Sequence, residues 1–424
     1  MNGRRRVLRA GYAAGLAALL GCLPNVAHSQ RRADPVRAKA RGTAKPAWVE
    51  KLPLMQWHSI PNTSLINHCP LQPLIRAGLS DSAGNSIGFG HPRRGIFDFS
   101  GGSLKKEGSI MLVFGGGGAG AWAGNDVRGL ALNQDVPAWS FLKDPSPSDA
   151  VWPRTASGAA HPYMKDGTPN ARHAYWQPIF IDKCNRFMLF GCQNVWEIDS
   201  GTFNNVDGLD LPGGSWSPAG TYRPLPRKRG WDSSWNCKHP LTERVYSGSP
   251  EAITEYDPDA DVYRTIYSVA YTGVERGWAA IDPKRNLLLR VGLWRGSDRF
   301  NIPLTLDLSG SRSIASVGVL TGPYAKMNWP VYPGFVFDPN LDKFVMFKDD
   351  GHLYTFAPDG PDNWYVDRLN LTPDPRAGVP ASHGSSIHGS DPAIWGRMQY
   401  VPELSGIAIL QSANANCWFI RTAA

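Results

Sequence analysis

Short apolar runs separated by polar or glycine-rich turns recur along most of the chain. Residues 109–132, SIMLVFGGGGAGAWAGNDVRGLAL, show the pattern in its simplest form. The apolar run SIMLVF predicts a β-strand, a glycine-rich turn follows, and residues 127–132 predict a second strand. The order is therefore strand, turn, strand.

The glycine-rich turn also contains a weak nucleotide-binding signature. Gly115, Gly117 and Gly120 satisfy G-x-G-x-x-G. A dinucleotide-binding loop must open a helix, however, and residues 124–126, Gly-Asn-Asp, interrupt any helix here. We therefore expect a turn between two strands and no phosphate site.

The unit recurs through the rest of the chain, at residues 176–199, 235–257, 278–308, 335–359 and 398–422. Each copy has an apolar strand, a polar turn, a second strand, a Gly- or Asp-bearing turn and a third strand. Four copies are followed by a fourth strand with an aromatic residue near its start: Trp139, Trp216, Tyr263 and Trp364. Four-stranded sheets bury both faces when they stack radially, so the pattern predicts an all-β, six-bladed β-propeller with four antiparallel strands per blade.

The two ends of the predicted ring complement each other. The sixth unit ends after its third strand, whereas residues 56–66, which begin QWHSIPNTSL, have the fourth-strand pattern with Trp57 in the aromatic position. We expect this segment to complete the last blade, which removes an unpaired sheet edge. Closure of this kind would bring Cys69 toward Cys417, where a disulfide could bridge it.

Two of the units resemble a known repeat. Val113-Phe114-Gly115-Gly116, Gly124-Asn125-Asp126-Val127 and Trp139 resemble a kelch motif, and Pro169-Asn170-Ala171-Arg172-His173, Phe190-Gly191 and Trp196 resemble a second. Together they are similar to kelch-type propellers, including the galactose oxidase central domain, over about residues 50–424. The resemblance implies a propeller scaffold that is mostly used for binding and sometimes for oxidation at a copper centre.

The N-terminal region has the features of an export signal. Residues 1–29 have a basic start, an apolar segment too short to span a bilayer, and a small-residue cleavage site, Ala27-His28-Ser29. Residues 4–9, Arg-Arg-Arg-Val-Leu-Arg, resemble a twin-arginine signal, and Leu19-Leu20-Gly21-Cys22 resembles a bacterial lipobox. We expect a protein secreted, periplasmic or at the cell surface of a bacterium, with a lipoprotein anchored through Cys22 as the alternative; a membrane contact is expected only then.

Charge separates the chain into two parts. The net charge is +8, but residues 1–45 alone carry +9, so the remainder is close to neutral. Residues 30–45 are predicted to be a basic, disordered tether, and residues 46–424 the propeller. A near-neutral body argues against a nucleic-acid partner. Five cysteines follow the signal, with no metal-ligand spacing; most are expected to be buried apolar residues.

Aromatic residues and arginines precede or begin the predicted first strands, where a propeller's central channel opens. The candidate ligand-binding residues are Trp176, Trp231, Trp278, Trp329, Tyr332, Trp395, Arg172, Arg276 and His173. Indole faces stack on sugar rings and arginines donate to hydroxyls and carboxylates. The alternative interpretation is packing between blades.

Enzyme signatures are weaker. His173, His352, His383 and His388 are candidate copper ligands, but no tyrosine or cysteine matches the galactose oxidase pattern, so loop histidines without a metal are favoured. Nucleophile-elbow and H-E-x-x-H motifs are absent. Asp232, Glu275, Asp298 and Asp391 could form a glycosidase pair, or could be solvated loop acids.

The sequence thus favours a binding module for carbohydrate or a protein surface, without a cofactor or metal and with no assigned catalytic residue. A copper-dependent oxidase or other propeller enzyme is the first alternative, and a structural surface protein the second.

Overall fold

The computed structural model describes residues 45–424 except 117–120, 155–157, 198–201, 212, 227–234, 249–251, 269–273, 295–302, 311–313, 328, 330–331, 349, 361 and 373–392. Side chains are also not described at residues 192, 274–276, 293–294 and 314–315. The unit Lys45–Ala424 is almost entirely β-structure.

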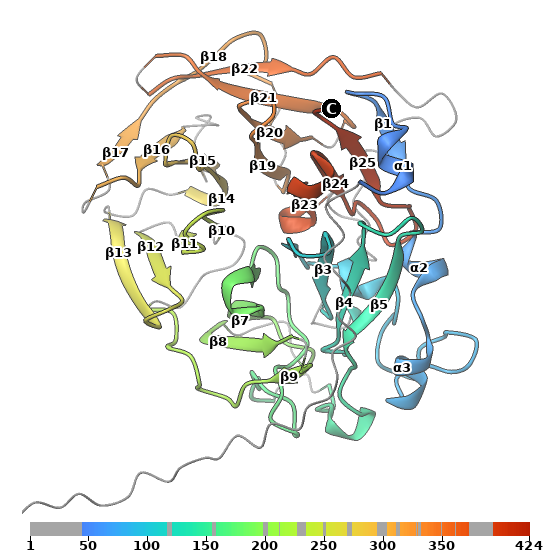
Figure 1. Cartoon of the computed structure of the whole chain (residues 1–424). Helices are drawn as coiled ribbons and strands as arrows, with labels where there is room; N and C mark the ends of the chain where they lie inside the picture. Colours follow the sequence, from blue (N-terminus) through green and yellow to red (C-terminus); the bar gives the residue numbers. More distant parts are fainter. Residues whose placement is uncertain are drawn as a thin grey trace, which may run out of the picture. The chain divides into compact units, whose positions relative to one another are not determined.

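Six sheets, here called blades 1 to 6, form a ring, and each has four antiparallel strands (Figure 1). Blade 1 contains β2 (Gly102–Lys105), β3 (Ile110–Phe114), β4 (Val127–Ala131) and β5 (Ala138–Lys143). Blade 2 contains β6 (Pro178–Ile181), β7 (Arg186–Gln193), β8 (Thr202–Asp210) and β9 (Ser215–Trp216). Blade 3 contains β10 (Trp235–Lys238), β11 (Val245–Gly248), β12 (Ala252–Asp257) and β13 (Val262–Ser268).

Blades 4 to 6 repeat this order. Blade 4 contains β14 (Val274–Asp282), β15 (Leu287–Trp294), β16 (Leu304–Asp307) and β17 (Ile314–Val317). Blade 5 contains β19 (Gly334–Asp338), β20 (Lys343–Phe347), β21 (Leu353–Pro358) and β22 (Trp364–Arg368), and β18 (Leu320–Thr321) adds a parallel edge strand. Blade 6 contains β23 (Met398–Val401), β24 (Gly406–Ile409), β25 (Trp418–Arg421) and β1 (Trp57–Ser59). The predicted six-bladed propeller is confirmed.

The N-terminal strand closes the ring, as the sequence predicted. β1 pairs antiparallel with β25, with Trp57 opposite Ile420 and Ser59 opposite Trp418. The first strands of neighbouring blades (β2, β6, β10, β14, β19 and β23, here called the inner strands) contact one another around the whole ring, including β2 with β23. Closure therefore leaves no gap between blade 6 and blade 1.

The segment between β1 and blade 1 is compact. It contains the short helices α2 (Leu65–His68) and α3 (Gln72–Arg76), and α1 (Ala47–Glu50) precedes β1. Short 3-10 turns lie at η1 (Gly95–Phe97), η2 (Ser148–Ala150), η3 (Asp182–Cys184), η4 (Trp395–Arg397) and η5 (Pro402–Leu404). Leu65 and Leu74 pack in one core cluster with residues of blades 6 and 1, so this segment covers the closure.

The expected disulfide at the closure does not form. Cys69 and Cys417 are buried in that same cluster, and both are free thiols. Arg128 Nη1 approaches Cys69 Sγ at 3.7 Å, and the Cys417 thiol contacts the Trp418 carbonyl at 3.7 Å. Both cysteines behave as small buried apolar residues.

Three of the fourth-strand aromatic residues contact the preceding blade. Trp57 of blade 6 meets Phe347 of blade 5 edge-on at 6.2 Å, and Trp216 of blade 2 meets Phe114 of blade 1 at 5.9 Å. The indole N–H of Trp364 in blade 5 donates to Thr305 Oγ1 of blade 4 at 3.0 Å. The repeated aromatic position seen in the sequence is thus an inter-blade contact, and it explains why single sheets need neighbours.

The glycine-rich region of blade 1 is a turn between strands. β3 and β4 pair antiparallel, with Phe114 opposite Val127. A Cβ atom at Gly115 would lie 2.4 Å from the Gly124 carbonyl oxygen, so only glycine fits. Gly117 and Gly120 lie outside the described residues.

Antiparallel order places the two kinds of connection at opposite ends of the ring. The turns between the first and second strands of each blade lie at one end, here called the hairpin end. The segments that lead from one blade to the next lie at the other, here called the connection end. Every first-to-second-strand turn has a non-glycine residue with positive φ near its end: Ser109, Asn185, Glu243, Asn286, Asp342 and Ser405.

Polar side chains join neighbouring blades at the hairpin end. Lys106 N donates to Asp182 Oδ1 between blades 1 and 2, and Lys183 N to Glu243 Oε2 between blades 2 and 3. The four remaining junctions are bridged in the same way, by His239–Asn286, Arg285–Asp342, Asn340–Thr422 and Ser109–Glu403. Side chains of the hairpin turns thus link the whole ring.

Candidate functional site

The predicted aromatic residues come together, but inside the protein. Trp176, Trp278, Trp329, Tyr332 and Trp395 belong to a single core cluster and are at most 8% exposed. Trp278 stacks on Trp329 at 6.4 Å, and Tyr332 lies 5.2 Å from Trp395. Their described surroundings are those of the packing alternative, so their role in ligand binding stays a prediction. Trp231 lies outside the described residues.

Arg172 and His173 are also buried. Arg172 Nη2 donates to Asp207 Oδ2 at 2.8 Å, and its Nη1 donates to the Gly191 carbonyl at 3.1 Å. The His173 ring stacks on Phe99 at 4.1 Å, and its Nδ1 lies 3.0 Å from Tyr175 Oη. Arg172 thus ties the segment before β6 to blade 2, whereas the His173 ring packs against the segment before β2 of blade 1. The side chain of Arg276 is not described.

Arg397 has a comparable role at the junction of blades 6 and 1. Its guanidinium donates to the carbonyls of Phe97, Ser100, Ala393 and Leu410. It also lies over the Phe97 ring at 4.6 Å. Burial lowers the pKa of Arg397 to about 9, so the side chain remains protonated at neutral pH.

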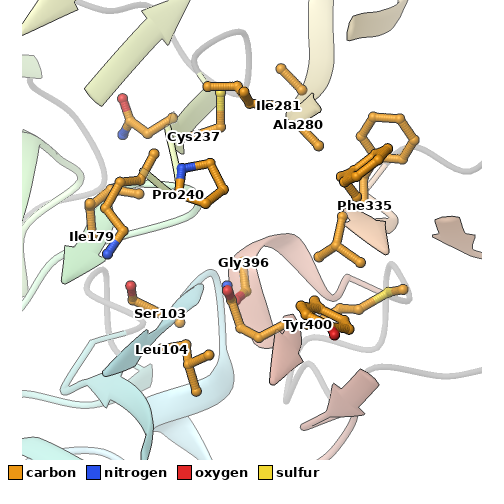
Figure 2. A pocket seen from close by; sticks show the side chains of 18 of the residues that line it. Ser103, Leu104, Ile179, Cys237, Pro240, Ala280, Ile281, Phe335, Gly396 and Tyr400 are labelled. Carbon is orange, nitrogen blue, oxygen red and sulfur yellow. The ribbon is translucent and has the colours of Figure 1, made fainter. Parts of the chain in front are cut away.

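A cavity of about 520 Å³ runs along the ring axis. All six inner strands line it, and Figure 2 shows Ile179, Cys237, Ile281, Phe335 and Tyr400 around it. This volume is within the usual range for small-molecule sites. Of the predicted site residues, Trp176 lines the cavity.

The cavity wall offers few free hydrogen-bonding groups. Ser103 Oγ accepts from the Phe180 N–H at 2.8 Å, and Asn236 Nδ2 donates to the Trp176 carbonyl at 3.0 Å. Gln399 Nε2 donates to the Gly396 carbonyl at 2.7 Å. Burial raises the pKa of Cys237, which keeps its thiol neutral. Away from the two lysines at the opening, the described wall is therefore largely apolar, and these three polar side chains bond within the protein.

The cavity reaches the surface at the hairpin end. Leu241 lines it and is 74% exposed. Other lining residues in the hairpin turns are Lys106, Pro240, Pro283, Pro339 and Pro402. At the connection end, the lining residues Trp176 and Gly396 are buried. Among the described residues, the opening is thus at the end opposite the one the sequence suggested.

A charged cluster stands at this opening. Lys106 Nζ lies 3.0 Å from Glu243 Oε1 and 3.7 Å from Asp182 Oδ2, and Lys238 Nζ contacts both carboxylates. Burial acts to raise the pKa of Glu243, but Lys238, the Lys183 N–H and Lys106 outweigh it and lower that pKa to about 2. Glu243 therefore stays ionised at neutral pH, and the cluster joins blades 1, 2 and 3.

Sequence reasoning missed this opening and its charges. The lysines and acids belong to turns of three different blades and form no motif along the chain. A signal was available at the ends of the inner strands. Asp282 and Asp338 end apolar strands and are followed by Pro283 and Pro339, and Asp182 directly follows a third apolar strand. That repetition identifies one end of the ring, but it does not indicate an opening or a charged cluster at that end.

The described residues show no arrangement of side chains that supports the copper or the glycosidase alternative. Among the described residues, no three His, Cys, Asp or Glu side chains are grouped so as to hold a metal ion. His383, His388, Asp232, Asp298 and Asp391 lie outside those residues, and the side chain of Glu275 is not described. His352 is exposed on the turn after β20.

Comparisons find distant structural similarity. No protein-family model matches the chain, and no curated protein matches it. A solved structure of YjhT is 11% identical, with 77% of this chain and 94% of that chain covered and a TM-score of 0.47. XC5397, described as a gluconolactonase from Xanthomonas campestris, is 9% identical over 80% and 92%, with a TM-score of 0.42. The Malassezia sympodialis allergen Mala s 1 is 10% identical over 65% and 80%, with a TM-score of 0.40.

These similarities are too low to carry an argument about function. The class of this protein, a six-bladed β-propeller, rests on its own six sheets. Kelch-type and galactose oxidase-like membership stays a resemblance. No helix within the described residues is long and apolar enough to cross a membrane. Residues 1–44, which contain the predicted signal and lipobox and all of the predicted tether (residues 30–45) except Lys45, lie outside those residues.

Proposed function

We propose that this protein binds a small, largely apolar molecule in its central cavity. The observation that carries the proposal is the cavity itself, which is enclosed by six inner strands and has an apolar wall. Each Å² of apolar surface that a ligand buries there contributes about 25 cal/mol. A sugar would lose its hydrogen bonds to water without finding enough partners in the wall.

The test uses a neutral apolar probe and a variant that fills the cavity. N-phenyl-1-naphthylamine should fluoresce on binding to the wild-type protein. Ala280 lies on β14 and lines the cavity, so Ala280→Trp should remove most of the binding. Ala260→Trp, on an exposed turn of blade 3, is the matched control and should bind like the wild type.

The melting temperature of each variant is measured as well, to establish that the protein is folded. If folded Ala280→Trp protein binds the probe as the wild type does, the cavity is not the site. If the folded wild type does not bind the probe, the proposal fails directly.

Binding of carbohydrate or of a protein surface through the aromatic residues is a second proposal. It is supported by the gathering of five candidate aromatics in one cluster, with Trp176 at the cavity wall. Trp176→Ala and Trp395→Ala should abolish such binding in protein that circular dichroism shows to be folded. Unfolding of these variants would instead assign the residues to packing. Export to the periplasm or cell surface, and copper-dependent oxidation, remain predictions from the sequence.

A further inference from the structure

We propose that Lys106 and Lys238 hold the anionic head of an amphipathic ligand whose apolar tail occupies the cavity. This inference rests on the proposed function and narrows it to anionic amphiphiles, with a carboxylate head as the simplest case. Both lysines line the cavity and lie near its opening, in the turn after β2 and at the end of β10. A molecule with its tail inside would therefore place its head beside them.

The cluster is arranged so that its positive side faces the cavity. Lys106 and Lys238 are among the lining residues, whereas their partners Asp182 and Glu243 are not. The Glu243 side chain is only 7% exposed, compared with 34% for Lys106. Glu243 is thus the more buried member of its pair with Lys106, whereas Asp182, at 19%, is about as exposed as Lys238, at 13%.

Backbone groups hold the acids in place. Asp182 Oδ1 accepts from the Lys106 N–H at 2.8 Å, and Glu243 Oε2 accepts from the Lys183 N–H at 2.9 Å. Lys106 Nζ also donates to the Pro240 carbonyl at 2.8 Å. The ammonium groups are thus fixed in place before a ligand arrives, which reduces the entropy lost on binding.

The opposite side of the opening is apolar. Pro283, Pro339 and Pro402 line it from blades 4, 5 and 6. Exposed Leu241 adds an apolar side chain on blade 3, beside the lysines. Positive charge on one side, apolar residues on the other and an apolar channel beyond match a molecule with one anionic head. A neutral hydrocarbon would leave the ammonium groups unused, and a polyanion would find no further cations among the described lining residues.

The experiment compares ligands that differ in the head alone. Dodecanoate and dodecanol are titrated as competitors of N-phenyl-1-naphthylamine, and the readout is the ratio of their affinities. In the wild type, dodecanoate should bind about tenfold more tightly, the effect of one charge-assisted hydrogen bond. Dodecyl phosphate is the third ligand: tighter binding than dodecanoate would identify a phosphate head rather than a carboxylate.

Two variants should move this ratio in opposite directions. Lys238→Met keeps the apolar stem but removes the charge, so the preference for dodecanoate should disappear. Glu243→Gln removes a carboxylate that competes for both lysines, so the preference should increase severalfold. A general loss of structure would lower both affinities and could not raise the ratio.

Lys284→Met is the matched control. Lys284 lies at the same end and pairs with Asp342 at 2.9 Å, but it does not line the cavity, so the ratio should stay at the wild-type value. If dodecanol and dodecanoate bind equally, or if Lys238→Met leaves the ratio unchanged, the head site is wrong although the cavity still binds. Failure of every ligand, including the neutral probe, would overturn the proposed function instead.

Discussion

The two ends of the ring are built differently. At the hairpin end, six turns share a positive-φ residue, and side chains of these turns link each blade to the next. The segments that connect one blade to the next differ widely in length: residues 269–273 connect blades 3 and 4, whereas residues 369–397 connect blades 5 and 6. At the connection end, individual buried arginines such as Arg397 bind backbone carbonyls.

This difference shows two ways to hold a propeller together. The hairpin end spreads its stabilisation over many small, similar bonds, most of which are partly exposed to water. The connection end concentrates it in a few buried groups, each with several partners. Substitutions should therefore have larger effects at the connection end.

Arg397→Met tests the buried side of the comparison and should have the largest effect. Four backbone carbonyls would lose a buried donor, at about 1 kcal/mol each, so the free energy of unfolding should fall by about 4 kcal/mol. Urea unfolding followed by tryptophan fluorescence measures this. Arg368→Met, at an exposed position on blade 5, is the control. Equal effects of the two substitutions would show that the buried arginine is not a main support.

Acid should weaken the hairpin end through Glu243. Its pKa is about 2 in the folded protein and about 4.5 when unfolded, so the unfolded chain takes up the proton first. The contribution of Glu243 to stability is complete above pH 4.5 and is lost as the pH falls from 4.5 toward 2. The urea midpoint measured across this range should fall less steeply in Glu243→Gln. Parallel curves for both proteins would contradict the assignment of the low pKa.

A pair of substitutions at Asn286 separates backbone conformation from bonding and should have the smallest effect. Asn286 has a φ of 55° and accepts a hydrogen bond from His239. Asn286→Ala should cost about 1–2 kcal/mol, because a side chain other than Asn or Gly is unfavourable in this conformation and the bond is also lost. Asn286→Gly should cost under about 1 kcal/mol, since only the bond is lost. Equal losses in thermal unfolding would show that the positive φ carries no cost.

The direction of the His239–Asn286 bond follows from the local geometry. His239 Nδ1 accepts from the backbone N–H groups of Leu241 and Thr242, at 3.1 and 3.3 Å. The proton of the neutral ring therefore lies on Nε2, which donates to Asn286 Oδ1 at 2.8 Å. Burial lowers the pKa of His239, which favours this neutral form.

The fold was predictable because its signals are local and repeated. Alternating apolar strands and polar turns located the blades, and Trp57 in the aromatic position located the strand that closes the ring. The same aromatic position in other blades, as at Trp216 and Trp364, is fixed by contact with the preceding blade. Because a contact at this position recurs in several blades, an aromatic residue recurs at the matching position of the sequence.

The site was not predictable in the same way. Trp278 and Trp395 were placed near the correct strands, but sequence does not show which side of a strand faces a channel and which faces a neighbouring blade. The opening depends on Lys106 and Lys238, which meet Glu243 only after three blades have assembled. Contacts between these residues leave no characteristic spacing in the sequence.

The closing strand has a consequence for how the chain reaches its final form. The Cys417 N–H donates to Thr63 Oγ1 across 354 positions of sequence. Contacts between such distant residues form slowly, because a long loop must be closed before they stabilise anything. A ribosome synthesises residues 57–59 long before their partners in β25. Blade 6 therefore cannot be completed before β25 has been synthesised, whereas the strands of blades 1 to 5 are all available earlier.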